Sequence, residues 1–423
     1  FEKHKIKINY HKNKYDIKGN GNILLEDKSD SLSYHVTKNN NHITFDSKIK
    51  LISNPLSIDF LEYKKKEGHS SLILVKGNFK KDNKLKFDLI SLNEKNNQIS
   101  VKGLDLNKNF KIIDMKSFNI NYKNDKKILN KLNIKKNNSK FIIEGESFDA
   151  TELINKIMDT DEESLSIFHD LNTKISIKIK KTYIDEYNYI NNLYGNINFN
   201  NNKINDLKLD SAFPNNKKIN LSIKTNNNFE TITKLSTDYP KPLIKRYNFI
   251  QGFEEGYLDF YSNKRGGVTN SVLIIDNFKI KKVPIFAKLL SLASLQGIAD
   301  LLTGEGIRFT DFEMNFTNYK GITKIEEMYA IGPAVSLLMN GYIESDKIVS
   351  LKGTLVPATT INRTIASIPI LGKILIGDKV GEGVFGVSFK VKGTQKDLKT
   401  TVNPIKTLTP RFIIRTLENI KKN

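Results

Sequence analysis

The chain has 423 residues, of which 67 are Lys or Arg and 46 are Asp or Glu, so its formal net charge at pH 7 is +21. The absence of Cys excludes a disulfide scaffold, a cysteine nucleophile and any thiolate metal or iron–sulfur site. Hydrophobic residues make up only 39% of the sequence, which predicts a thin apolar core beside much wetted polar surface.

The N-terminal part, residues 1–144, alternates apolar and polar side chains with a period of two, as half-buried antiparallel strands do. Ile6, Ile8 and Tyr10 form the first such series. Asn-rich turns such as 39–41 separate the series, and Asn tolerates the left-handed backbone that hairpins need. One strand in roughly 12–15 residues predicts about twenty strands in meander order along the chain. The sequence opens without Met or a signal peptide, which suggests a fragment whose targeting or anchoring segment was left out.

The strand pattern continues through residues 145–282, where positions 174–180 alternate Lys or Ser with Ile. A short helix is predicted near 150–159, because its Leu and Ile residues share one side. Asp149 stands where an N-cap is expected.

The C-terminal part, residues 283–423, contains three segments that are apolar on one helical face: 284–302, 360–376 and 410–422. They are too short or too polar to be ordinary transmembrane helices. Two interpretations stay open for them. They cap the end of the sheet as core, or they contact a membrane or a membrane-bound partner, and both can hold on opposite faces.

The positive charge comes mostly from Lys interleaved with Asn at alternate strand positions, which favours a solvated sheet face. An anionic membrane surface is the alternative. Nucleic acid is disfavoured, because Arg, the better residue for bidentate phosphate and base contacts, is sparse.

No catalytic or metal-binding pattern stands out in the sequence. The six His residues lack metal-ligand spacing, and no GxSxG, P-loop or HExxH motif occurs. Residues 381–386 match GxGxxG, but a strand pattern follows where a dinucleotide site requires a helix. We therefore expect neither an enzyme nor a cofactor.

Strands with one apolar face must pack that face against something. A second sheet, a closed barrel or a hydrophobic ligand would each serve, and a long meander could also curl into an open groove.

Several short segments follow one another in the C-terminal third, at 283–295, 304–309, 330–334, 353–358, 368–373, 381–387 and 402–404. In order and spacing they resemble the C-terminal region of the AsmA-like superfamily of Gram-negative envelope proteins, in particular its long YhdP-type members. A weaker segment lies at 145–154, and residues 1–144 share only the strand pattern.

The resemblance implies a mainly β fold: a long antiparallel meander curled into an open, apolar-lined β-groove, with a few amphipathic helices toward the C-terminal end. Family members are thought to pass phospholipid along the groove between the inner and outer membranes. The predicted groove lining is Phe118, Ile120, Ile175, Ile177, Ile179, Leu207, Leu209, Leu221, Ile223, Phe385, Val387 and Phe389. The predicted membrane or partner contacts are Phe286, Leu289, Leu290, Ile298, Leu302, Ile370, Leu371, Ile374, Phe412, Ile413, Leu417, Arg411 and Arg415.

The prediction is therefore non-enzymatic, bridge-like phospholipid transport in the periplasm, with an inner-membrane anchor outside this chain. Acyl chains, both membranes and envelope proteins are the expected partners, and nucleic acid is not. The alternative is an assembly factor that chaperones outer-membrane β-proteins by pairing with their edge strands. An unbroken apolar stripe from strand to strand would favour transport, whereas polar interruptions beside a long bare edge would favour the chaperone.

Overall fold

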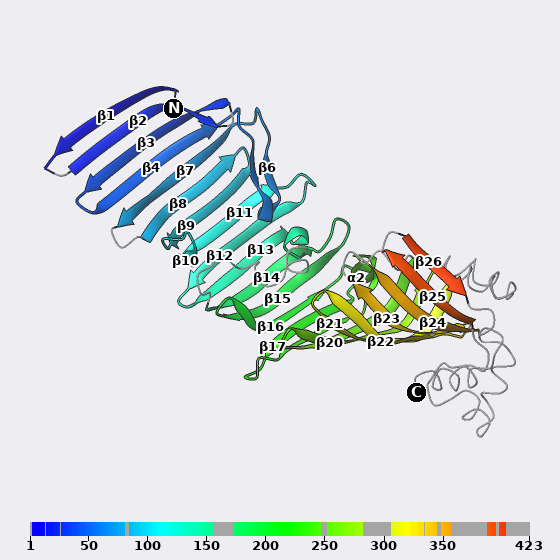
Figure 1. Ribbon diagram of the computed structural model, residues 1–423. Helices are drawn as coiled ribbons and strands as arrows, with labels where there is room; N and C mark the ends of the chain where they lie inside the picture. Colours follow the sequence, from blue (N-terminus) through cyan, green and yellow to red (C-terminus); the bar gives the residue numbers. More distant parts are fainter. Residues whose placement is uncertain are drawn as a thin grey trace. The chain divides into compact units, whose positions relative to one another are not determined.

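The computed structural model describes residues 2–12, 14–25, 27–80, 84–154, 172–246, 252–281, 306–333, 335–344, 348–357, 387–394 and 397–402. Most of these residues lie in β-strands (Figure 1), so the predicted mainly β fold is confirmed. The chain divides into two compact units, Phe1–Asn216 and Lys217–Asn423. The boundary falls inside the segment 145–282 of the sequence-based division.

The first unit is built on a sheet whose neighbouring strands are mostly neighbours in the sequence (Figure 1). Its strands are β1 (Glu2–His11), β2 (Lys14–Leu25), β3 (Lys28–Asn39), β4 (His42–Leu51), β7 (Ser71–Lys80), β8 (Lys84–Glu94), β9 (Asn97–Leu106), β10 (Ile112–Asp114), β11 (Ser117–Lys123), β12 (Leu129–Asn137), β13 (Lys140–Asp149), β14 (Thr173–Tyr183), β15 (Tyr189–Asn200) and β16 (Lys203–Ala212). Between β4 and β7, a two-stranded sheet of β5 (Leu56–Ile58) and β6 (Tyr63–Lys65) flanks the 3-10 turn η1 (Asp59–Leu61).

The predicted Asn turns form hairpins for the expected reason. Asn40 connects β3 to β4 with a φ of 51°, and Asn201 and Asn202 connect β15 to β16 with φ values of 48° and 62°. Asn adopts this left-handed backbone more readily than most residues, so the turns set the register of the flanking strands.

The sheet is mixed, which corrects the expectation of an antiparallel meander throughout. β13 and β14 pair in parallel, with Ile143 opposite Ile177. A parallel pair needs a crossover between its strands, and the connection 150–172 is long enough for one. That connection begins with a helical turn at 151–154, the start of the predicted helix, and the Asp149 side chain accepts from the Thr151 N–H at 3.1 Å.

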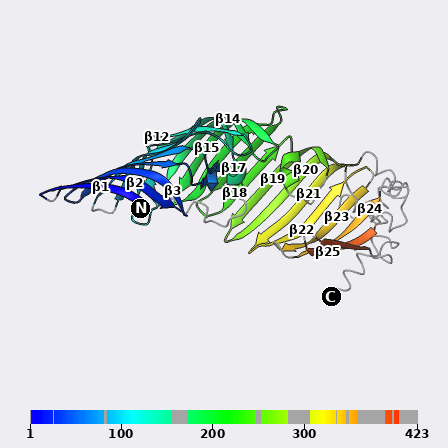
Figure 2. The same ribbon diagram turned by 90° about the horizontal axis from the view of Figure 1, so that it is seen from above.

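The second unit has its own run of antiparallel strands, and Figure 2 shows β19 to β25 side by side. The strands are β17 (Lys218–Thr225), β18 (Thr231–Thr237), β19 (Phe253–Arg265), β20 (Val268–Ile280), β21 (Ile307–Tyr319), β22 (Ile322–Ile331), β23 (Val335–Glu344), β24 (Val349–Pro357), β25 (Val387–Thr394) and β26 (Asp397–Val402). A short helix that the sequence did not predict, α2 (Lys241–Arg246), places Ile244 in the hydrophobic cluster of this unit.

Neither sheet closes on itself among the described residues, because no strand pairing joins the first strand of a unit to its last. The three predicted amphipathic helices at 284–302, 360–376 and 410–422 lie outside the described residues. In the part of the chain that the structure describes, no helix has the length and apolar character needed to cross a membrane.

Candidate functional site

The first unit carries one uninterrupted row of side chains across its sheet. Residues directly opposite one another on adjacent strands project from the same face, so successive pairs trace the row, which we call the central lane. In strand order its members are Ile6, Gly19, Tyr34, Ser47, Val75, Ile90, Val101, Phe118, Ile134, Ile143, Ile177, Gly195 and Leu209. None of these residues is charged.

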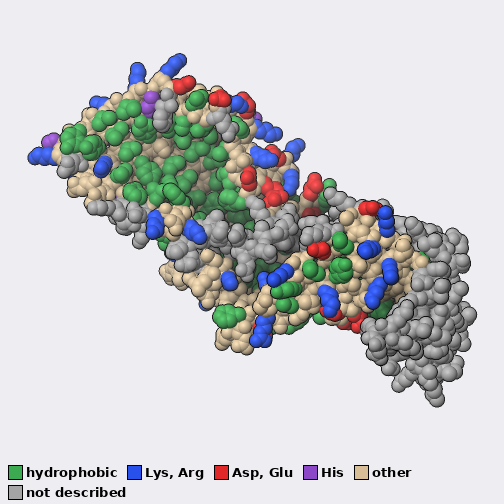
Figure 3. Space-filling view, in the orientation of Figure 1, with side chains coloured by type: hydrophobic (Ala, Val, Ile, Leu, Met, Phe, Trp, Pro, Cys, Tyr) green, Lys and Arg blue, Asp and Glu red, His purple; other side chains and the backbone are tan. Residues whose placement is uncertain are grey.

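Two further rows flank the central lane on the same face, and Figure 3 shows hydrophobic side chains gathered there in one broad patch. One flanking row is Gly21, Leu32, Ile49, Ile73, Leu92, Ile99, Ile120, Leu132, Gly145, Ile179 and Leu193. On the other side, β1 to β9 contribute Ile8, Ile17, Val36, Phe45, Gly77, Phe87 and Leu104. The apolar face is therefore several side chains wide.

A segment between β4 and β7 covers one margin of this face. We call residues 52–70 the strap. Its Leu61 and Tyr63 pack in one buried cluster with Leu92, Ile99 and Ile120 of the first flanking row. The central-lane members Phe118, Ile143 and Ile177 pack against this cluster but are only half-buried, so the lane beside the strap stays partly open.

Hydrogen bonds and ring contacts fasten the strap to strand ends. The Asp30 carboxylate accepts from the backbone N–H groups of Ile52, Ser53 and Asn54 at 2.7, 3.0 and 3.0 Å. Further along, the rings of Tyr63 and Tyr122 meet edge to face, with 5.4 Å between centroids. The Tyr122 hydroxyl donates to the Leu61 carbonyl, and the Tyr63 hydroxyl donates to Glu94 at 2.8 Å.

These contacts shift the ionisation of the groups beneath the strap. Burial opposes the charge on Asp30, but the backbone donors outweigh it and hold the Asp30 pKa below its usual value. Glu94 follows the same balance: burial opposes its charge, and donors led by Tyr63 lower its pKa. Burial raises the pKa of Glu62, and the Asp149 carboxylate adds to that increase against the opposing effect of Lys126. The strap is therefore held against the sheet by carboxylates that accept hydrogen bonds from other groups of the protein.

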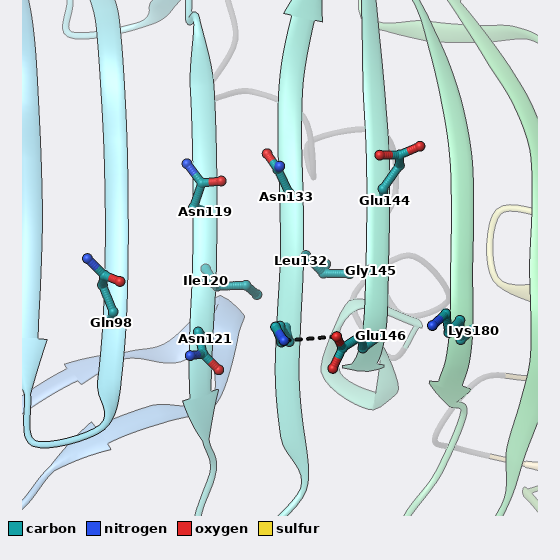
Figure 4. Close-up of a pocket in the computed structure, with 11 residues that line it drawn as sticks. Gln98, Asn119, Ile120, Asn121, Leu132, Asn133, Glu144, Gly145, Glu146 and Lys180 are labelled. Atoms are coloured by element: carbon teal, nitrogen blue, oxygen red, sulfur yellow. Dashed lines mark hydrogen bonds and ion pairs between the residues drawn. The ribbon is translucent and has the colours of Figure 1, made fainter.

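The opposite face of the same sheet is polar. One row there reads Lys5, Asn20, Ser33, Lys48, Leu74, Ser91, Ser100, Asn119, Asn133, Glu144, Lys178, Tyr194 and Asp210. An open pocket of about 380 Å³ lies on this face, where Asn119, Asn133 and Glu144 project beside the 2.8 Å ion pair of Lys131 and Glu146 (Figure 4). Among the described residues, no group of three or more His, Asp or Glu side chains could hold a metal ion.

The second unit has a similar row on its own strands. Opposite residues trace one row from β17 to β26: Leu221, Leu235, Phe260, Leu273, Met314, Met328, Met339, Gly353, Phe389 and Val402. Three methionines stand side by side in its middle. Met side chains are flexible and polarisable, so this part of the row can adapt its shape to what lies on it.

The structure places the predicted lining residues as follows. Phe118, Ile177 and Leu209 lie in the central lane, and Ile120 and Ile179 lie in the flanking row beside it. Ile175 and Leu207 lie opposite Ile197 in a row on the same face, near the other margin.

In the second unit, Leu221 and Phe389 belong to the apolar row, and Ile223 and Val387 lie two residues away on the same face. Phe385 lies outside the described residues, as do all thirteen predicted membrane or partner contacts: Phe286, Leu289, Leu290, Ile298, Leu302, Ile370, Leu371, Ile374, Arg411, Phe412, Ile413, Arg415 and Leu417.

Sequence reasoning missed the strap. Its strands are three residues long, too short for a period-two signal, and the left-handed Glu62 (φ 50°) after η1 interrupts the alternation. The methionine row was missed because its members fall in three strands, and only the register brings them together. No protein-family model matches the sequence, and no curated protein matches it at a significant level.

Proposed function

We propose that this protein is an AsmA-like bridge for phospholipid in the bacterial periplasm, in which acyl chains slide along an open groove formed by the apolar faces of its sheets. The observation that carries the proposal is the central lane. It crosses thirteen strands without a charged side chain, and all its members except the buried Gly19 are half-buried or exposed. An apolar sheet face that is partly exposed to solvent indicates a binding site for an apolar ligand or partner.

The energetics of lipid transfer support this use of the face. A diacyl lipid exposes about thirty methylene groups, each worth about 0.8 kcal/mol on burial, so crossing water alone costs upwards of 20 kcal/mol. Strands lie about 4.8 Å apart, so thirteen of them give a lane about 58 Å long along the sheet. A mostly apolar, uncharged lane of that length offsets most of the barrier and needs no chemical step. The polar opposite face keeps such a sheet wetted on its other side.

The chaperone alternative draws support from β1. Among the described residues it pairs only with β2, and its Ile6, Ile8 and Tyr10 are 56%, 61% and 59% exposed. Such an edge can accept another strand. The transport proposal is favoured because the stripe continues through twelve strands beyond this edge without a charge, and its one serine, Ser47, donates its hydroxyl to the Val75 carbonyl.

A photo-crosslinking experiment tests the transport proposal on one strand. A photoreactive residue at Ile134, in the central lane, should capture phospholipid from cells or from vesicles, and mass spectrometry would identify the adduct. Asn133 is the matched control, because the neighbouring position on β12 projects from the polar face. Equal lipid capture at both positions, or none at Ile134, would reject acyl binding on this face.

A further inference from the structure

The two margins of the first unit's apolar face differ in charge. The strap margin carries acids and lysines in similar numbers: its acids are Asp27, Asp30, Asp59, Glu62, Glu67, Glu94, Asp125, Asp149, Asp185 and Glu186, and its lysines are Lys28, Lys50, Lys64, Lys65, Lys66, Lys95, Lys123, Lys126, Lys127 and Lys181. The other margin, which we call the hairpin margin, contains the turns β1–β2, β3–β4, β9–β10, β12–β13 and β15–β16. Its described lysines are Lys12, Lys14, Lys38, Lys108, Lys111, Lys136, Lys140 and Lys203.

Two acids near the hairpin margin form ion pairs with lysines. Asp105 lies 3.2 Å from the Lys86 ammonium, and Asp114 lies 2.6 Å from that of Lys136. The hairpin margin is therefore positively charged, whereas acids and lysines nearly balance at the strap margin. A phosphate on a lipid in the lane would therefore be attracted more strongly to the hairpin margin than to the strap margin.

One cluster at the hairpin margin combines hydroxyl and ammonium groups, which can bind the phosphate of a phospholipid headgroup. Tyr10, Tyr15 and Lys38 stand directly opposite one another on β1, β2 and β3, as the outermost row of the apolar face. The two rings lie 4.8 Å apart between centroids, and the Lys38 ammonium lies 5.7 Å from the centre of the Tyr15 ring. No carboxylate of the described residues lies within ion-pair distance of this ammonium, and the side chain is exposed.

Directly inward from this cluster the same three strands turn apolar. Ile8, Ile17 and Val36 form the next row, about 6.8 Å away along the strands. A row that carries hydroxyl and ammonium groups therefore lies at the margin, directly beside an apolar row. Tyr and Lys have the amphipathic side chains that proteins place at such boundaries.

We propose that Tyr10, Tyr15 and Lys38 bind the phosphate of a phospholipid whose acyl chains lie on the adjoining apolar rows. The inference rests on the proposed function and adds the headgroup class and its orientation: an anionic phosphate, held at the hairpin margin and away from the strap. Lys38 supplies the charge, and the two phenol hydroxyls donate hydrogen bonds to phosphate oxygens.

The test compares two ligands that share their acyl chains. The full chain, free of detergent, is titrated with phosphatidylglycerol and with diacylglycerol carrying the same fluorescent acyl chain. Lys38→Gln should weaken phosphatidylglycerol binding about 5-fold, as expected for one exposed charge contact, and leave diacylglycerol binding unchanged. Lys48→Gln is the matched control, because Lys48 is also exposed but projects from the polar face of β4. The double variant Tyr10→Phe/Tyr15→Phe keeps the rings but removes both hydroxyls. It should also weaken phosphatidylglycerol binding and leave diacylglycerol binding unchanged.

The outcomes separate the two proposals. If both ligands bind the unmodified chain and Lys38→Gln changes the affinity for both of them equally or for neither, the headgroup assignment is wrong and the transport proposal stands. If neither ligand binds the unmodified chain, the transport proposal fails and the headgroup site fails with it. If Lys48→Gln weakens phosphatidylglycerol binding as much as Lys38→Gln does, the attraction is nonspecific. That result would also overturn the assignment.

Discussion

Replacing Ile177 with Asp should reduce the lipid bound to this protein at least tenfold. Ile177 lies in the central lane of β14, opposite Ile143 on one neighbouring strand and Gly195 on the other. An acyl chain that crosses an ionised carboxylate strips water from it, and an unpaired charge in apolar surroundings is strongly disfavoured. The loss would be read as lipid co-purified per protein by mass spectrometry, and as capture by a photoreactive residue at Leu209, the next apolar member of the lane.

The matched control for this change is Ser176→Asp. Ser176 is the preceding residue of the same strand, is exposed and projects from the polar face. It adds the same charge without touching the lane, so lipid content should stay at the unmodified level. Both variants need intact melting curves, because Ile177 is half-buried and its loss carries a folding cost. Unchanged lipid content in a folded Ile177→Asp protein would mean that acyl chains do not use this lane.

The strand pattern could be predicted because each strand needs only local information. Alternation at 174–180 fixes which side chains share a face, and the pairing of Ile175, Ile177 and Ile179 with β15 follows directly once the strands are neighbours. Asn turns such as 39–41 then fix which strands meet. Seven predicted lining residues of the first unit fall on one face for that reason: Phe118, Ile120, Ile175, Ile177, Ile179, Leu207 and Leu209.

The features that could not be predicted from the sequence depend on contacts between distant positions. The parallel pairing of β13 with β14 is decided by where the connection 150–172 crosses, which no local period encodes. The strap is positioned by contacts far apart in the sequence, such as Tyr63 against Tyr122. The charge difference between the margins also appears only when alternate turns are assigned to the same side of a folded sheet.

The second large effect concerns the strap. Replacing Asp30 with Ala should loosen it locally, because this carboxylate accepts backbone hydrogen bonds from three successive strap residues, Ile52, Ser53 and Asn54. Asp30 is 5% exposed, and losing bonds to a buried charge should cost about 2–4 kcal/mol. Hydrogen exchange should report this as about a 30-fold or larger loss of amide protection across the strap. Asp46→Ala is the control, because Asp46 forms only an exposed ion pair with Lys76 and should change little.

The same carboxylate predicts how the strap responds to acid. The pKa of Asp30 is lower in the folded protein than its ordinary value near 3.8, so the unfolded strap binds more protons in that range. Its stabilising effect is therefore complete above about pH 4 and is lost as the pH falls through the lowered pKa. Glu94 acts in the same direction and Glu62 in the opposite one, so the difference between the unmodified protein and Asp30→Ala isolates Asp30. That difference in protection should be large at pH 6 and shrink on acidification. Equal protection in both proteins at pH 6 would show instead that ring packing of Tyr63 and Tyr122 holds the strap without help from the carboxylate.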